Sequence, residues 1–228
     1  PDLFGPGNHK KFFQIFDHFG NFEYFDELDR ETEPSAKKGL LQQLFESRIT
    51  LAEAAHDKQD ATGFELAKDL VKADVSALPE DCLCIRDKWR EKRAVEKEGV
   101  IDGFQPATLG LLRDEIAPLM QWRDTAGNEA AYRFDLLIAR LQETKLSGSA
   151  DFENLRDEII AILSSLPISM SQVAEKETLI NQAKELTYYE EGTVETFEEL
   201  RKELRGLVKF ARRVIDPALE APTYRISE

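Results

Sequence analysis

The chain has 228 residues, which is enough for one large domain or two small ones with a sizeable core. Its formal net charge is −14, and an acidic chain repels phosphates, so nucleic-acid binding by this chain alone is disfavoured. No stretch approaches ~18 consecutive apolar residues, and the start of the chain carries neither a basic leader nor an apolar signal core. The two cysteines are best explained as reduced structural thiols, so we expect a cytoplasmic protein.

Aromatic residues are concentrated at the start of the chain, where seven of the fourteen phenylalanines fall within the first 25 residues. The run Phe12 to Phe16 is short, apolar and bounded by turn-forming residues, so it predicts a buried strand. Nothing downstream predicts a partner strand, and a lone strand cannot pair its backbone groups. We therefore expect the chain to begin inside a sheet whose other strands lie upstream of Pro1.

The rest of the chain carries apolar residues at spacings of three, four or seven, which is typical of amphipathic helices. Capping boxes at Thr62–Glu65 and Thr196–Glu199 should begin the second and the last helix. Pro118 should end or kink the fourth. In chain order, the expected helices span residues 34–56, 62–78, 79–98, 109–120, 130–141, 152–166, 173–186 and 196–215.

Three short patterns resemble catalytic or metal-binding motifs, but each lacks a necessary part. Glu53 and His56 have the i, i+3 spacing of a di-iron ligand pair, yet no second such pair exists for a facing helix. Asp2 and the run Glu143 to Lys145 carry the letters of a PD-(D/E)xK nuclease, but they are far apart and Glu143 ends a helix. The run Gly5 to Gly7 lacks the lysine of a phosphate-binding loop. The sequence therefore predicts no catalytic, metal-binding or cofactor-binding residue in this chain.

The best local candidate for a contact site is the basic stretch from Arg86 to Lys97. Its basic residues and the tryptophan among them suit phosphates or an acidic partner, and the candidates are Arg86, Lys88, Trp89, Arg90, Lys92 and Arg93. Acidic residues in the same stretch dilute its net charge to about +2. An exposed helix with Trp89 anchored in the core therefore explains the stretch better than a binding site does. Trp122 is expected in the core or at a partner interface.

Several blocks of the chain resemble one known family. They are PDLFGPG (residues 1–7), KKFFQIFD (10–17), GNFEYF (20–25), LRDEIAPLM (112–120), RFD (133–135) and LRKELRGLVKF (200–210). These blocks are similar to the C-terminal region of the R (motor and nuclease) subunit of type I restriction enzymes. The first three are the most specific, because helices rich in leucine, arginine and glutamate are common. The tail 222–228 departs from the more acidic ending of that family.

The resemblance implies a domain organisation. Residues 1–30 would be the terminal strand and linker of a RecA-like motor domain, and residues 31–228 would form a C-terminal helical domain. The expected fold class is therefore mainly α, a multi-helix bundle with a short N-terminal β segment left over from the preceding motor domain.

The resemblance also implies a function. The parent would be an ATP- and Mg²⁺-dependent DNA translocase and nuclease, with its nucleotide motifs upstream of Pro1 and no cofactor bound by this chain. The helical domain would be non-catalytic and would dock the R subunit onto the methyltransferase core of modification and specificity subunits. DNA would be contacted through the parent and not strongly through this chain. The alternative is a stand-alone all-helical protein–protein interaction module.

Overall fold

The computed structural model describes residues 38–211, and every regular element in that range is a helix, as expected from the sequence. The predicted strand Phe12–Phe16 and the predicted domain boundary after residue 30 lie outside the described residues. The α-helices are α2 (Leu40–Asp57), α3 (Ala61–Ser76), α4 (Leu83–Arg86), α5 (Trp89–Glu96), α6 (Pro106–Leu111), α7 (Glu129–Ser147), α8 (Asp151–Ser164), α9 (Ser171–Ala174), α10 (Glu177–Gln182), α11 (Leu186–Glu191) and α12 (Val194–Leu204). The other elements are the π-helix η1 (Leu112–Ile116) and the 3₁₀ helices η2 (Ala117–Trp122) and η3 (Val208–Phe210). None of the helices within 38–211 is both long and apolar enough to cross a bilayer.

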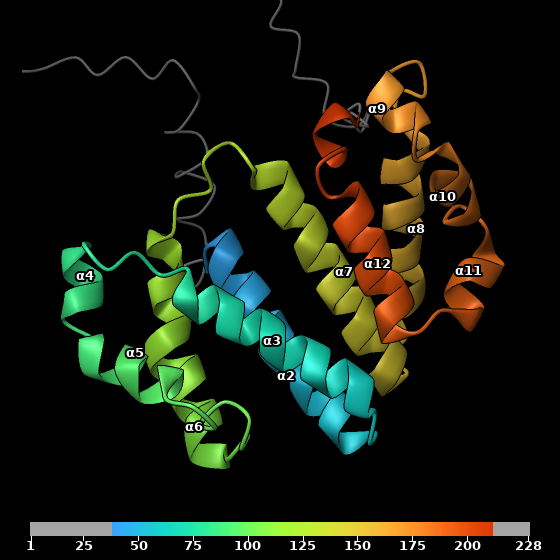
Figure 1. The fold of residues 1–228 in the computed structure, drawn as a ribbon. Helices are drawn as coiled ribbons and strands as arrows, with labels where there is room; N and C mark the ends of the chain where they lie inside the picture. The colour runs from blue at the N-terminus through green and yellow to red at the C-terminus, as the bar shows by residue number, and fades with distance from the viewer. Residues whose placement is uncertain (1–37, 212–228) are drawn as a thin grey trace, which may run out of the picture. The chain divides into compact units, whose positions relative to one another are not determined.

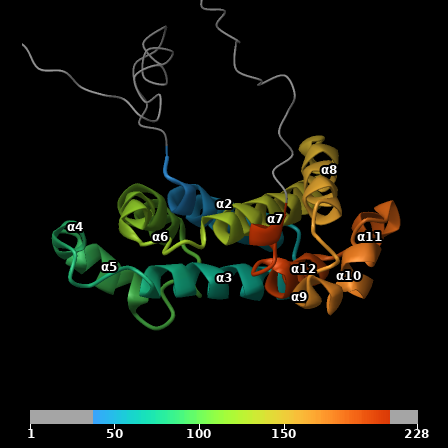
Figure 2. The ribbon, with the colours of Figure 1, turned by 90° about the horizontal axis from the view of Figure 1, so that it is seen from above.

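Helix α7 lies between two groups of helices and contributes to the core of each (Figure 1). Leu136 and Ala139 pack into a core shared with α2, α3, α4, α5 and the η1–η2 segment. Phe134, Ile138 and Leu141 pack into a second core with α8–α12. Seen from above, α2 and α7 run side by side (Figure 2). Burying one large apolar side chain stabilises a fold by ~1.5–3 kcal/mol. Because α7 buries such side chains on two faces, it joins the two groups of helices into one packed unit.

A buried aspartate ties the first group together. The carboxylate of Asp74 on α3 accepts hydrogen bonds from Arg48 Nη1 on α2, at 2.6 Å, and from Arg123 Nη1 after η2, at 2.7 Å. All three side chains are nearly inaccessible to water. A buried charge is tolerated only when it is paired and hydrogen-bonded, so this aspartate fixes how three segments meet.

A second buried aspartate does the same between α7 and α12. Asp135 accepts hydrogen bonds from Arg201 Nη1, at 3.0 Å, and from Arg205 Nη2, at 2.9 Å. Arg201 also donates from Nε and Nη2 to the two carboxylate oxygens of Glu198, both at 2.7 Å. Burial opposes the charged form of Arg201, but the hydrogen bonds to Glu198 and Asp135 outweigh it and raise the pKa of its guanidinium. The network holds α12 in one register along α7.

The segment that begins with α6 changes helix type before Pro118. Pro118 has no N–H group, and its ring clashes with the carbonyl of Asp114 in a regular α-helix. The chain responds with the wider π turns of η1 and then the tighter 3₁₀ turns of η2. Pro118 does not end this helical segment, which continues to Trp122, but the helix type changes on either side of Ile116.

Two predicted capping boxes are wrong, and the first helix begins at Leu40 instead of residue 34. The N-cap of α3 is Asp60, whose carboxylate accepts from the N–H of Gly63, so Thr62 lies inside the helix. The capping box of α12 is formed by Thr193 and Thr196, three residues before the predicted one. In both places a second side chain able to cap stands just upstream, and the helix extends back to it.

Three predicted helices are shorter or broken in the structure. The region 79–98 forms the short helices α4 and α5, and the region 173–186 lies within the three short helices α9–α11. The last α-helix ends at Leu204 instead of running to 215, and a turn containing Gly206 leads into η3. Glycine is unfavourable inside a helix, which accounts for the early end. Residues beyond 211 lie outside the described range.

Candidate interaction sites

Four residues of the predicted basic stretch form an exposed surface, named here the α4–α5 face: Arg86, Trp89, Arg90 and Arg93. The three arginines are exposed, and among residues 38–211 none of them forms an ion pair. Trp89 is half-buried, and the guanidinium carbon of Arg93 lies 4.5 Å from the centre of its ring. Such an exposed cation–π contact is worth ~0.5–1 kcal/mol, so Arg93 holds the tryptophan side chain in place.

Two of the three lysines of the same stretch, Lys88 and Lys92, form ion pairs within the protein. Lys88 Nζ lies 2.6 Å from Glu115 Oε2 of η1, and this hydrogen bond raises the pKa of Lys88. Lys92 is only 2% exposed, and its Nζ lies 2.7 Å from Glu96 Oε1. The Lys88 pair ties the start of α5 to η1, and the Lys92 pair lies within α5. Both ammonium groups are neutralised, so among residues 38–211 the cations of the stretch without an ion pair are the three arginines and Lys97.

The expected anchoring of Trp89 in the core is wrong, because the core-facing residues of α5 are Lys92 and Val95. Two further apolar side chains nearby are exposed. Leu83 on α4 is 71% exposed, and α4 packs beside η2, which ends at Trp122 with 47% of its surface exposed. Of the two expectations for Trp122, a core position is excluded and an interface position stays a prediction.

Cys82 and Cys84 are free thiols in the structure. Cys82 packs against the first core, and burial together with the neighbouring Cys82 raises the pKa of the Cys84 thiol. A thiol with a raised pKa is a poor nucleophile at neutral pH, which agrees with the structural role expected from the sequence.

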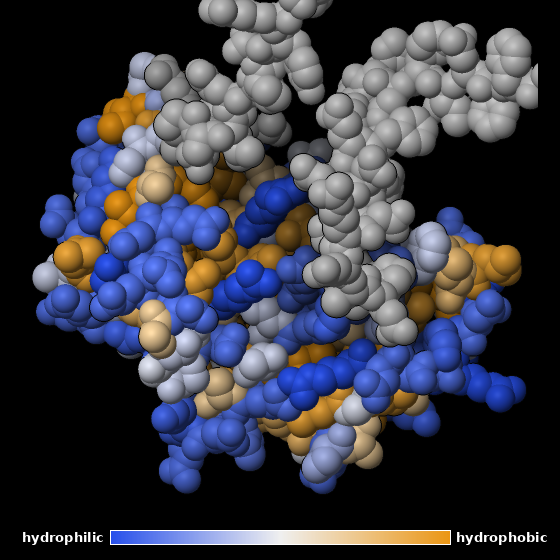
Figure 3. All heavy atoms as spheres, turned by 180° about the vertical axis from the view of Figure 1, so that it is seen from behind, coloured by the Kyte–Doolittle hydropathy of each residue, from blue (hydrophilic) through white to orange (hydrophobic). Residues whose placement is uncertain are grey.

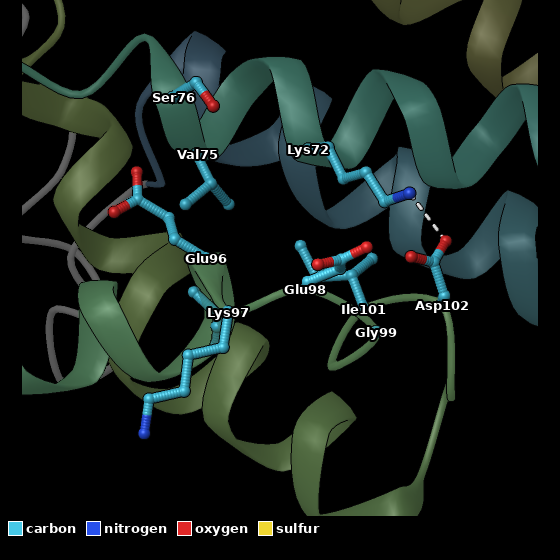
Figure 4. A pocket seen from close by; sticks show the side chains of 10 residues that line it. Lys72, Val75, Ser76, Glu96, Lys97, Glu98, Gly99, Ile101 and Asp102 are labelled. Atoms are coloured by element: carbon cyan, nitrogen blue, oxygen red, sulfur yellow. Dashed lines mark hydrogen bonds and ion pairs between the residues drawn. The ribbon is translucent and has the colours of Figure 1, made fainter.

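A hollow of about 340 Å³ lies between α3 and the segment that follows α5 (Figure 4). Its floor is formed by the buried residues Val75, Val95 and Ile101. Lys72 Nζ donates to Asp102 Oδ1 at 2.5 Å across one end, and this contact raises the pKa of Lys72 and lowers that of Asp102. The hollow is therefore bridged by its own side chains, and the bridge fastens the segment to α3.

A larger groove, of about 610 Å³, lies between α2, the start of α6 and the C-terminal part of α7. It brings together Glu53, His56 and Glu143, which belong to two of the motifs that the sequence analysis set aside. Phe104, Pro106 and Leu109 supply apolar lining. No pattern in the sequence predicts this groove, because it exists only through the packing of α2 against α7.

The groove does not have the character of a metal centre. Within residues 38–211, histidine, cysteine, aspartate and glutamate side chains never gather in a group of three or more that suits a metal ion. Glu53 is instead held by Arg113, which donates from Nη1 to its Oε1 at 2.8 Å and from Nη2 to its Oε2. Burial raises the pKa of the Glu143 carboxyl, while the charge of Arg140 opposes that change.

The described surface is mostly hydrophilic when seen from behind, with hydrophobic areas exposed between charged side chains (Figure 3). Such a mixture of charged and apolar side chains is ordinary for a folded protein and does not by itself single out a binding face. Comparison with known proteins adds no assignment to this picture: no family model, no curated protein and no solved structure matches the chain.

Proposed function

We propose that the chain is a helical docking domain that binds a protein partner through the α4–α5 face. The observation that carries this proposal is the set of three exposed arginines around the half-buried Trp89, without an ion-pair partner among the described residues. The chain as a whole has a net charge of −14, so these cations stand out against an acidic background. Arginine and tryptophan are the residue types that most often dominate the binding energy of interfaces.

The partner suited to this face carries carboxylates. A planar guanidinium pairs with a carboxylate through two parallel hydrogen bonds, which gives both energy and orientation. Trp89, held by Arg93, adds apolar area at a low cost in side-chain entropy, and the exposed Leu83 on α4 extends that area. Such a face selects an acidic protein surface with an apolar centre.

The resemblance to the R subunit of type I restriction enzymes supports one identity for the partner. In such an enzyme the subunit must remain attached to the methyltransferase core while its motor moves DNA, and a helical domain provides an anchor. On this proposal the modification or specificity subunit presents the acidic surface. ATP, Mg²⁺ and DNA are handled by the parent enzyme.

Co-purification tests the proposal. The chain is mixed with the assembled modification and specificity subunits and passed over a gel-filtration column, alongside the variant R86Q/R90Q/R93Q. The matched control is R133Q/K184Q/K209Q, which removes the same number of charges from other parts of the described chain. We expect the unaltered chain and the control to elute with the methyltransferase and the first variant to elute alone. If all three chains co-elute with the methyltransferase, the α4–α5 face is not the docking surface. If none of them does, the methyltransferase is not the partner.

A further inference from the structure

The groove between α2, α6 and α7 combines an apolar wall with a negative end. Phe104 stands at its wall, with its ring packed edge-on against Phe64 at 4.9 Å and tilted against His56 at 6.0 Å. The backbone of Phe104 has a φ of +44°, a region that bulky residues rarely enter. Such strain costs ~1–3 kcal/mol and persists only where the surrounding structure holds it. The contacts with Phe64 and His56 therefore hold the Phe104 ring at the groove although the backbone conformation of Phe104 is unfavourable.

The negative end of the groove is formed by two carboxylates in different states. Glu53 is occupied, because Arg113 binds both of its oxygens. Glu143 is half-buried, and it has no hydrogen bond or ion pair with any other residue in the range 38–211. Of the other charged lining residues, Asp57 is acidic and Lys58 is basic, and the charge of Arg140 also acts on Glu143. The groove thus offers one half-buried carboxylate without a direct partner among the described residues, beside an apolar wall.

We propose that this groove binds an arginine or lysine side chain from a partner polypeptide. The aliphatic stem would lie along Phe104, Pro106 and Leu109, and the cation would pair with Glu143. Long basic side chains bury their stems on apolar surface while their charged ends find a counterion. The face of an aromatic ring adds attraction for the same cation. No other occupant satisfies all of these features together.

Two other kinds of occupant fit less well. An anion would lie beside the carboxylates of Glu143 and Asp57 and be repelled. A neutral apolar molecule would remove water from Glu143 without supplying a counterion, which costs free energy for a charged group. The groove lies on α2, α6 and α7, so the inference does not depend on the α4–α5 face.

Capped tripeptides provide the direct test. The whole chain, labelled with ¹⁵N, is titrated with acetyl-Ala-Arg-Ala-amide or acetyl-Ala-Lys-Ala-amide and followed by NMR. The controls are the same peptides with citrulline in place of arginine and norleucine in place of lysine, which keep the shape and remove the charge. We expect the charged peptides to shift amide signals around Glu53, Phe104 and Glu143, and the neutral ones to bind at least about tenfold more weakly, a difference of 1.4 kcal/mol.

Three variants complete the design. E143Q should lose about tenfold in affinity for both charged peptides, since it removes the counterion. F104L keeps an apolar wall without the aromatic face and should weaken the arginine peptide by a smaller factor. E158Q, the same chemical change at an exposed residue of α8, should leave binding unchanged. Equal binding of the neutral and charged peptides, unchanged affinity in E143Q, or signal shifts confined to another surface would overturn the inference.

Discussion

The carboxylate of Asp135 and the guanidinium of Arg201 lie 3.0 Å apart, and both are buried between α7 and α12. Glu198 and Arg205 complete the network around them. Neither charge of the pair can be exposed to water without separating the two helices, so the contact links the ion-pair network directly to the packing of the second core.

Removing one partner of this pair should therefore be costly. We expect D135A to lower the free energy of unfolding by ~3–5 kcal/mol, because Arg205 would lose its counterion and the buried Arg201 would keep only Glu198. Urea unfolding followed by circular dichroism measures the change. D157A, which breaks the ion pair of the exposed Asp157 with Arg156, should cost less than ~1 kcal/mol. If D135A and D157A lose similar amounts of unfolding free energy, the Asp135 network stabilises the fold no more than an exposed ion pair does.

Gly192 occupies a position where a side chain has no room. A Cβ atom there would lie 2.5 Å from the carbonyl oxygen of Tyr188 and 2.7 Å from the ring of Phe197. Both neighbours belong to the packed second group, so G192A should lower stability by ~1–3 kcal/mol through overpacking. G110A is the matched control, since a Cβ at Gly110 meets nothing within 4 Å and alanine favours the helix. Thermal unfolding of the two variants should shift in opposite directions, and a stable G192A would contradict the packing.

The helices with continuous apolar stripes, such as α2 and α7, were predictable because a period of three to four residues fixes which face is buried. The N-cap of α3 was less predictable, because Asp60 competes with Thr62 for the same role and sequence alone does not rank the two. The interaction sites depend on tertiary packing. Lys88 and Arg86 belong to the same basic pattern in the sequence, yet only Lys88 is neutralised. Its partner Glu115 belongs to a segment distant in the sequence, so the pattern alone does not reveal the pair.

The raised pKa of Glu143 makes a prediction about pH. Burial favours the neutral carboxyl, so the folded chain holds this proton more tightly than the unfolded chain does. The contribution of Glu143 to stability therefore falls as pH rises from the unfolded pKa, ~4.3, through the raised folded pKa. The charge of Arg140 opposes the effect of burial, and the other charged or titratable groups that line the same groove are Glu53, His56, Asp57 and Lys58.

E143Q isolates this effect, because it keeps the shape of the side chain and removes its charge. The difference in melting temperature between E143Q and the unaltered chain should be near zero below the unfolded pKa and positive at pH 8. Calorimetry at both pH values measures it, and E158Q serves as the control without an expected pH trend. A difference that is larger at low pH than at pH 8 would mean that Glu143 is stabilised as an anion.

The acidic surface predicts weak binding to DNA. With a net charge of −14, the chain should not bind duplex DNA with sub-micromolar affinity at ~0.15 M salt. At lower salt, residual binding through the three arginines of the α4–α5 face should show a log–log salt slope no steeper than about −3. Fluorescence anisotropy with a labelled duplex checks both values. A steep slope that R86Q/R90Q/R93Q abolishes would instead identify this face as a nucleic-acid site.

Site-specific photo-cross-linking tests the central claim, that the α4–α5 face is the docking surface. A photoreactive benzoylphenylalanine replaces Arg90 in one preparation and Arg133 in another, and each is irradiated with the assembled methyltransferase. We expect position 90 to cross-link to a modification or specificity subunit, at a segment rich in aspartate and glutamate, and position 133 to give no such product. Cross-links from position 133 in the absence of any from position 90 would place the interface on another face and contradict the account.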